Sequence, residues 1–162
     1  METTDNAEQL LEKLDIVLNE YDNQHGIKVK LDNKVEQYLN YSIEDFNRLT
    51  PDQCGEISAV LAIYSIFIQK EQNRQSARVR WCESVIDNTI AQYISQYKTQ
   101  FQTFEERKLL AINGNSFTKK LNDLRIKAST RLSEIYGISS KIDLYIRTLL
   151  DLQQSKRRNH AS

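Results

Sequence analysis

The sequence predicts an all-α protein built on a long antiparallel helical hairpin, or coiled coil, with an N-terminal helical arm. Its 162 residues include only four Gly and one Pro, too few for the turns of a β-sandwich or barrel. It has no Gly-rich loop of the kind that binds nucleotides in α/β folds. Apolar residues instead recur at helical spacing. We expect an acidic arm and connector over residues 1–49, the hairpin over 50–155 and a basic tail over 156–162.

The arm is expected to begin with one amphipathic helix. Asp5 is a candidate N-cap, and apolar residues recur every three or four positions over 7–21. The helix should stop before Gly26. Alternating apolar residues and lysines over 27–31 predict an extended connector, and short helical pieces should follow over 34–49.

Three capping signatures mark further helix starts. Each has a capping Ser or Thr followed three residues later by Asp, Gln or Glu, and they are Ser42–Asp45, Thr50–Gln53 and Thr103–Glu106. Pro51 strengthens the second, because Pro is favoured at the first helical position. Asn115 or Ser116 is expected to cap the last helix.

The hairpin is predicted from three helices, over residues 51–97, 104–113 and 116–154. The first would be ~70 Å long, and so long a helix needs a partner along its length. A break is expected at 98–102. Gly114 and its Asn neighbours should end the short helix, because both residue types tolerate the left-handed conformation.

The last helix carries a heptad seam that predicts self-association. Ten positions alternate in steps of three and four, and nine of them are apolar or aromatic. The tenth, Arg131, is expected to set the register or to pair with an acid such as Glu83 on the facing helix. The nine seam residues are Leu121, Leu124, Ala128, Ile135, Ile138, Ile142, Tyr145, Leu149 and Leu152.

Charge is unevenly distributed although the net charge is zero. Residues 1–56 contain five bases and thirteen acids, and residues 57–162 contain seventeen bases and nine acids. This asymmetry predicts either an electropositive binding surface on the second part or an attraction between the two parts, within one chain or between chains.

The protein is expected to be cytoplasmic. The polar, acidic start does not fit a secretory signal, and no run approaches 18 apolar residues, so no membrane partner is expected. Cys54 and Cys82 would lie ~42 Å apart on one helix. They are therefore not expected to form a disulfide within the chain, which suits a reducing compartment.

We do not expect this protein to be an enzyme, because its sequence contains no recognisable catalytic pattern. Its two histidines, His25 and His160, fall in a loop and in the tail, and no cluster has metal-ligand spacing. No Ser lies in a nucleophile-elbow pattern. We expect no cofactor, no metal and no small-molecule substrate.

A basic stripe in the middle of the long helix is the candidate functional feature. The run 69–76 contains no apolar residue, and Lys70, Arg74, Arg78 and Trp81 share one helix face. On single-stranded DNA, cations track phosphates and an aromatic ring stacks on bases. With a second basic group on the last helix, the candidate nucleic-acid-binding residues are Lys70, Arg74, Arg78, Arg80, Trp81, Lys119, Lys120, Arg125, Lys127 and Arg131.

Each of these features also has a structural interpretation. A polar run on a long helix is usually a solvated face. Trp81 precedes Cys82, Val85 and Ile86, and it fits a core or a protein contact better than a base platform. The acidic and basic parts of the chain would then meet each other.

This layout resembles phage recombination mediators of the UvsY type. The resemblance rests on the stretches Tyr64–Lys70 and Arg78–Trp81 and on the heptad helix Leu121–Leu152. It implies a helical, ring-like homo-oligomer that binds single-stranded DNA and helps to load a recombinase past a single-strand-binding protein. The acidic first third and residues 103–115 depart from the pattern of that family.

We therefore expect a homo-oligomeric, single-stranded-DNA-binding recombination mediator or accessory protein. Its expected partners are itself, single-stranded DNA, and a recombinase or single-strand-binding protein. The alternative is a structural or adaptor coiled-coil protein without nucleic-acid binding, such as a virion component, a scaffold or a protein inhibitor.

Overall fold

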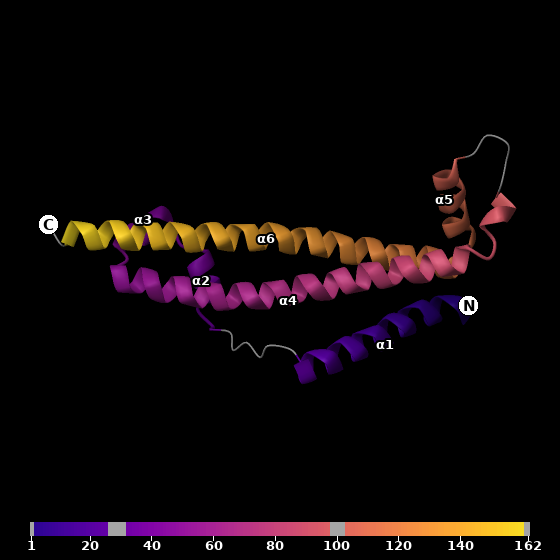
Figure 1. Ribbon diagram of the computed structural model, residues 1–162, viewed down its shortest axis with the longest axis horizontal. Helices are drawn as coiled ribbons and strands as arrows, with labels where there is room; N and C mark the ends of the chain where they lie inside the picture. The colour runs from indigo at the N-terminus through magenta and orange to yellow at the C-terminus, as the bar shows by residue number, and fades with distance from the viewer. Residues whose placement is uncertain (1, 26–31, 98–102, 161–162) are drawn as a thin grey trace. The chain divides into compact units, whose positions relative to one another are not determined.

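The computed structural model describes residues 2–25, 32–97 and 103–160 (Figure 1). These residues form helices without any strand, which confirms the all-α prediction. The elements are α1 (Glu2–His25), α2 (Val35–Leu39), α3 (Ile43–Arg48), α4 (Pro51–Ile90), the 3₁₀ helix η1 (Ile94–Tyr97), α5 (Phe104–Gly114) and α6 (Ser116–His160).

The two long helices α4 and α6 pack against each other, which confirms the predicted helical hairpin. Near one end of α4, a Cβ added at Gly55 would lie 2.7 Å from Gln153 Nε2 of α6. Further along α4, Glu83 pairs with Arg125. Residue numbers thus rise along α4 as they fall along α6, so the two helices are antiparallel.

The chain divides into two compact units. The α1 unit comprises residues 1–26 and 73–133, and the α3 unit comprises residues 27–72 and 134–162. Each unit therefore contains a part of α4, a part of α6 and a part of the predicted arm.

In the α1 unit, α1 and α5 complete a core with α4 and α6. The buried cluster comprises Ala7, Cys82, Ile86, Ile90, Ala111, Ile112 and Leu121. Ala7 is fully buried and Leu11 packs beside it, whereas Val17 and Tyr21 are 60% and 63% exposed, so only the first part of the apolar stripe of α1 packs on the unit's core. The arm helix is part of this unit.

In the α3 unit, α2 and α3 cover the α4–α6 pair. The buried cluster comprises Val35, Tyr38, Leu49, Cys54, Ile57, Leu61, Ile68, Ile135, Ile142 and Leu149. Phe46 of α3 packs against Tyr145 of α6, with ring centroids 5.5 Å apart. The Lys156 ammonium donates a hydrogen bond to the Asn47 carbonyl at 2.7 Å, which ties the end of α6 to α3.

The three predicted capping boxes are confirmed. The Ser42 and Thr103 side chains accept hydrogen bonds from the amides three residues later, and the acids at those positions bond back. Thr50 N–H donates to Gln53 Oε1 at 2.8 Å, and Gln53 N–H donates to Thr50 Oγ1 at 3.3 Å. Asn115 caps α6, since its Oδ1 accepts from Phe117 N–H at 2.9 Å.

Three predicted helix ends are wrong. α1 begins at Glu2, three residues before the predicted cap Asp5, and α6 runs to His160. α4 ends at Ile90, after which backbone hydrogen bonds join residues three positions apart, as in a 3₁₀ helix. There the Tyr93 hydroxyl donates a hydrogen bond to the Ala111 carbonyl of α5 at 3.3 Å. This contact with α5 outweighs the helix propensity of the following residues.

The junction of α5 and α6 also differs from the prediction. No described residue has a positive φ, and Asn115 is extended, with φ −122° and ψ 123°. Gly114 is needed for close approach instead, because a Cβ there would overlap the Tyr97 hydroxyl. The predicted connector at 27–31 and break at 98–102 lie outside the described residues, as do the last two residues of the predicted tail.

Candidate functional site

Two arginines of the basic stripe on α4, Arg74 and Arg78, contact α1. Arg78 makes a bidentate contact with Asp15, from Nε to Oδ1 at 2.9 Å and from Nη2 to Oδ2 at 2.7 Å. Arg74 donates to the Asn19 side chain and, at 3.5 Å, to the Asp15 carbonyl. The third predicted cation of this stripe, Lys70, is half-buried. Two of its predicted DNA-binding arginines thus have partners on the acidic helix.

Trp81 and Arg80 differ in exposure although they are adjacent. Arg80 is exposed, whereas Trp81 is half-buried and packs against the buried cluster of the α1 unit. Trp81 therefore contributes to packing within the α1 unit, which agrees with its structural interpretation.

The basic group on α6 is partly neutralised within the α1 unit. Lys120 Nζ lies 2.8 Å from Glu8 Oε1 of α1. Arg125 Nη1 lies 3.4 Å from Glu83 Oε1 of α4, so Glu83 pairs with Arg125. Lys119, Lys127 and Arg131 are exposed.

The Glu8–Lys120 contact shifts the pKa of both groups. The hydrogen bond and charge of Lys120 hold the pKa of the Glu8 carboxyl below its usual value, and Glu8 raises the pKa of Lys120. Because each shift favours the charged form, the pair is ionised at neutral pH.

The predicted oligomer seam lies largely inside the chain. Eight of its nine residues are buried or half-buried, and Ile138 is 37% exposed. Leu121 and Leu124 belong to the core of the α1 unit, whereas Ile142 and Leu149 belong to that of the α3 unit. Most of the seam residues therefore pack within their own unit.

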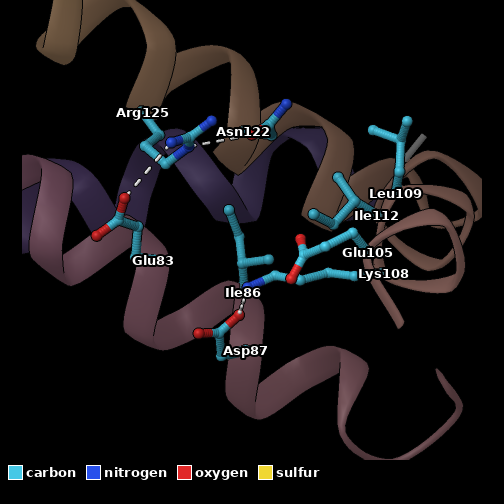
Figure 2. Close-up of a pocket in the computed structure, with 9 residues that line it drawn as sticks. All are labelled: Glu83, Ile86, Asp87, Glu105, Lys108, Leu109, Ile112, Asn122 and Arg125. Atoms are coloured by element: carbon cyan, nitrogen blue, oxygen red, sulfur yellow. Dashed lines mark hydrogen bonds and ion pairs between the residues drawn. The ribbon is translucent and has the colours of Figure 1, made fainter. Parts of the chain in front are cut away.

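A pocket opens between α4, α5 and α6 in the α1 unit (Figure 2). Its volume is about 470 Å³, and it is lined by Glu83, Ile86, Asp87, Glu105, Lys108, Leu109, Ile112, Asn122 and Arg125. Lys108 pairs with Asp87 at 2.8 Å. Sequence reasoning missed this site, because it exists only when α5 folds back beside α4; the one local signal was the capping acids at the start of α5.

The pocket combines charged, polar and apolar side chains. Its lining holds carboxylates, two cations and an amide around apolar Ile86 and Ile112, and it includes no Ser, Cys or His. Across the part of the chain that the structure describes, no group of His, Cys, Asp and Glu is arranged to hold a metal ion.

No helix among residues 2–25, 32–97 and 103–160 has an apolar stretch long enough to cross a membrane. In comparisons with known proteins, no family model, no curated protein and no solved structure matches this chain.

Proposed function

We propose that this chain is a non-enzymatic, protein-binding helical hairpin, a structural or adaptor component whose basic stripe is used inside the molecule. The observation that carries this proposal is the bidentate Arg78–Asp15 contact, with both side chains 27% exposed. An arginine held in this way by a carboxylate has its phosphate-binding geometry already occupied.

Two further observations support a protein-binding role. Lys120 and Arg125 have carboxylate partners in the α1 unit, so the charge asymmetry of the sequence is partly satisfied between α1 and the hairpin. Large apolar side chains are exposed on the outer faces of the helices, among them Ile63 on α4, Leu109 on α5 and Leu144 on α6. Ile63 adjoins Ile66 one turn along α4, which is also 45% exposed, and contiguous exposed apolar side chains favour contacts with another protein.

Single-stranded-DNA binding is the second candidate function. It is favoured by the exposed cations Arg80, Lys119 and Lys127 of the α1 unit. Lys119 and Lys127 are about two turns apart on α6. In this case the chain would act as the recombination mediator that its layout resembles, with a recombinase or single-strand-binding protein as its partner.

Fluorescence anisotropy of a labelled single strand of ~30 nucleotides, at about 50 and 200 mM salt, separates the two functions. We expect at most weak binding, with Trp81 emission unchanged by the oligonucleotide. The protein-binding proposal would be overturned by tight binding that weakens steeply as the salt concentration rises. The Lys119→Ala/Lys127→Ala double variant should in that case bind every single strand more weakly, whatever its base sequence. Lys141→Ala, which removes an exposed α6 cation from the α3 unit, is the matched control.

A further inference from the structure

Helix α1 contacts both long helices of the α1 unit through charged side chains. Asp15 pairs with Arg78 of α4 at 2.7 Å, and Glu8 pairs with Lys120 of α6 at 2.8 Å. The side chains of these two pairs are between 27% and 57% exposed, so water screens their attraction. α1 is therefore held in part by contacts that an acidic helix from outside the chain can also make.

The contacting residues of α1 form a pattern along one side of the helix. Ala7 is fully buried, and a larger side chain in its place would push α1 away from the long helices. Leu11 packs on the buried cluster of the α1 unit. Four contacting residues follow one another at steps of four, which places them on one helix face, and they are Ala7, Leu11, Asp15 and Asn19.

One position of α1 matches the surface beneath it poorly. Arg78 binds the Asp15 carboxylate, but the neighbouring Arg74 faces the neutral amide of Asn19. Within the part of the chain that the structure describes, the buried Arg74 Nε has no hydrogen-bond partner. A buried donor without an acceptor costs free energy. A carboxylate in place of the Asn19 amide would offer Arg74 two acceptor oxygens and a negative charge.

We propose that the surface beneath α1 is a docking site for an acidic helix of a partner protein, and that α1 is its exchangeable resident occupant. The inference rests on the protein-binding function and names the chemistry of the partner. Such a helix has a small residue, an acid one position later, an apolar residue four positions later, and acids eight and twelve positions later. It reproduces the contacts of α1 and also supplies the carboxylate that Arg74 lacks at Asn19, so it displaces α1 at sufficient concentration.

The surface suits a helix better than a nucleic acid. The three cations beneath α1 are each half-buried, and they are Arg74, Arg78 and Lys120. An anionic strand can pair with these cations, but it would leave the apolar core beneath Ala7 and Leu11 uncovered. A helix presents acids at the fixed spacing of the cations and covers the core with the same face, as in helix-in-groove recognition.

The partner helix has to compete with a helix that belongs to the same chain. A tethered segment acts at an effective concentration of about 1 mM. If a free helix of the α1 sequence has an intrinsic Kd of ~100 µM, the competition raises its apparent Kd to about 1 mM. A further charge-assisted contact strengthens binding by about 10-fold, so a helix with the additional acid should reach an apparent Kd of ~100 µM.

Fluorescence anisotropy of labelled synthetic helices, titrated with the full chain, tests the inference. The probes are a peptide of residues 2–25 in the native sequence and its Asn19→Asp and Asn23→Asp variants. Both variants add one negative charge, but Asn23 is an exposed residue one turn further along α1. We expect the Asn19→Asp peptide to bind about 10-fold more tightly than the other two. Arg74→Ala in the chain should abolish this difference between the peptides.

The same substitution should act in the opposite direction when it is made in the chain itself. Asn19→Asp in the full chain strengthens the docking of its own α1, so every peptide should bind that chain about 10-fold more weakly. Hydrogen exchange reads the displacement directly. In a chain labelled with ¹⁵N, whose α1 fragments differ in mass from the peptide, exchange along its own α1 should rise as the peptide binds.

Equal binding of the Asn19→Asp and Asn23→Asp peptides would overturn the inference, because net charge and not Arg74 would then decide the affinity. The absence of binding up to about 1 mM peptide would also overturn it, as would binding that leaves exchange in α1 unchanged. A single strand of DNA that displaces the bound peptide would assign the surface to nucleic acid instead. The proposed function is tested separately by the salt dependence of single-strand binding, and it stands if only the peptide results fail.

Discussion

The Arg78 guanidinium of α4 donates two parallel hydrogen bonds to the Asp15 carboxylate of α1, at 2.9 and 2.7 Å. The two residues are 63 positions apart in the sequence. Arg78 also donates to Gln75 Oε1 at 3.3 Å, which holds the guanidinium in place on α4. The contact therefore joins the acidic first third of the chain to its basic remainder inside one unit.

Removing this pair should loosen α1. In a double-mutant cycle of Asp15→Ala and Arg78→Ala, we expect a coupling energy of about 1 kcal/mol, because the pair is bidentate and only partly exposed. Hydrogen exchange along α1 should rise in each single variant. The measurement is chemical unfolding combined with exchange read by mass spectrometry.

The control for this cycle is the Glu44–Arg48 pair of α3. Its atoms are 4.0 Å apart and its side chains are about four-fifths exposed, so its coupling energy should be close to zero. Equal coupling in both cycles would contradict a structural role for the Asp15–Arg78 contact.

Local signals in the sequence predicted the secondary structure well. Capping boxes such as that of Thr103 depend on a few neighbouring residues, and the heptad positions of α6 follow from its period alone. The wrong end of α4 has a tertiary cause, since Tyr93 and Tyr97 turn toward α5. No local pattern records that contact.

The candidate site was less predictable, because it depends on which helices meet. The stripe of Arg74 and Arg78 does lie on one face, as its spacing indicates. The sequence leaves open whether that face meets a phosphate or α1, since both offer negative charge.

The two cysteines should be inert in the native protein. Both are fully buried, and burial raises the pKa of the Cys82 thiol to about 11. At pH 8 only about 0.1% of such a thiol is the reactive thiolate. An aromatic disulfide reagent should therefore label neither cysteine in the folded chain and both in denaturant.

A variant with Cys in place of the exposed Leu144, Leu144→Cys, provides the positive control for this labelling, because position 144 is 63% exposed. It should react rapidly with one equivalent of reagent. Rapid labelling of the native chain itself would show that one of the two units opens readily.

Two glycines should respond oppositely to alanine. A Cβ at Gly137, within α6, would meet nothing within 4 Å, so Gly137→Ala should raise the free energy of unfolding by about 0.5–1 kcal/mol through helix propensity alone. A Cβ at Gly114 would overlap the Tyr97 hydroxyl. Gly114→Ala should therefore lower that free energy by about 1 kcal/mol.

Thermal and chemical unfolding of the two variants measure these changes. In a Tyr97→Ala background the cost of Gly114→Ala should disappear, because the overlapping atoms are gone. A cost that persists in this background would place the strain in the backbone rather than in the Tyr97 contact.

The docking of α1 should depend on acid through Glu8. Lys120 lowers the pKa of the folded Glu8 carboxyl below its usual 4.5, so folding favours the ionised form. A lowered pKa contributes stability that is fully present above the unfolded value and is lost as the pH falls through the folded value. Protection factors along α1, which correct for the pH dependence of intrinsic amide exchange, should hence be high at neutral pH and should fall as the pH drops below about 4.5.

Glu8→Gln isolates this contribution, because it removes the titrating group while it keeps the shape of the side chain. In that variant the acid-dependent step in α1 exchange should shrink, and exchange at neutral pH should already be faster. Glu12→Gln removes the same charge from an exposed position one turn along α1 and should leave the step intact. If both variants lose the step equally, the acid response belongs to the net charge of α1, and the Glu8–Lys120 contact does not cause it.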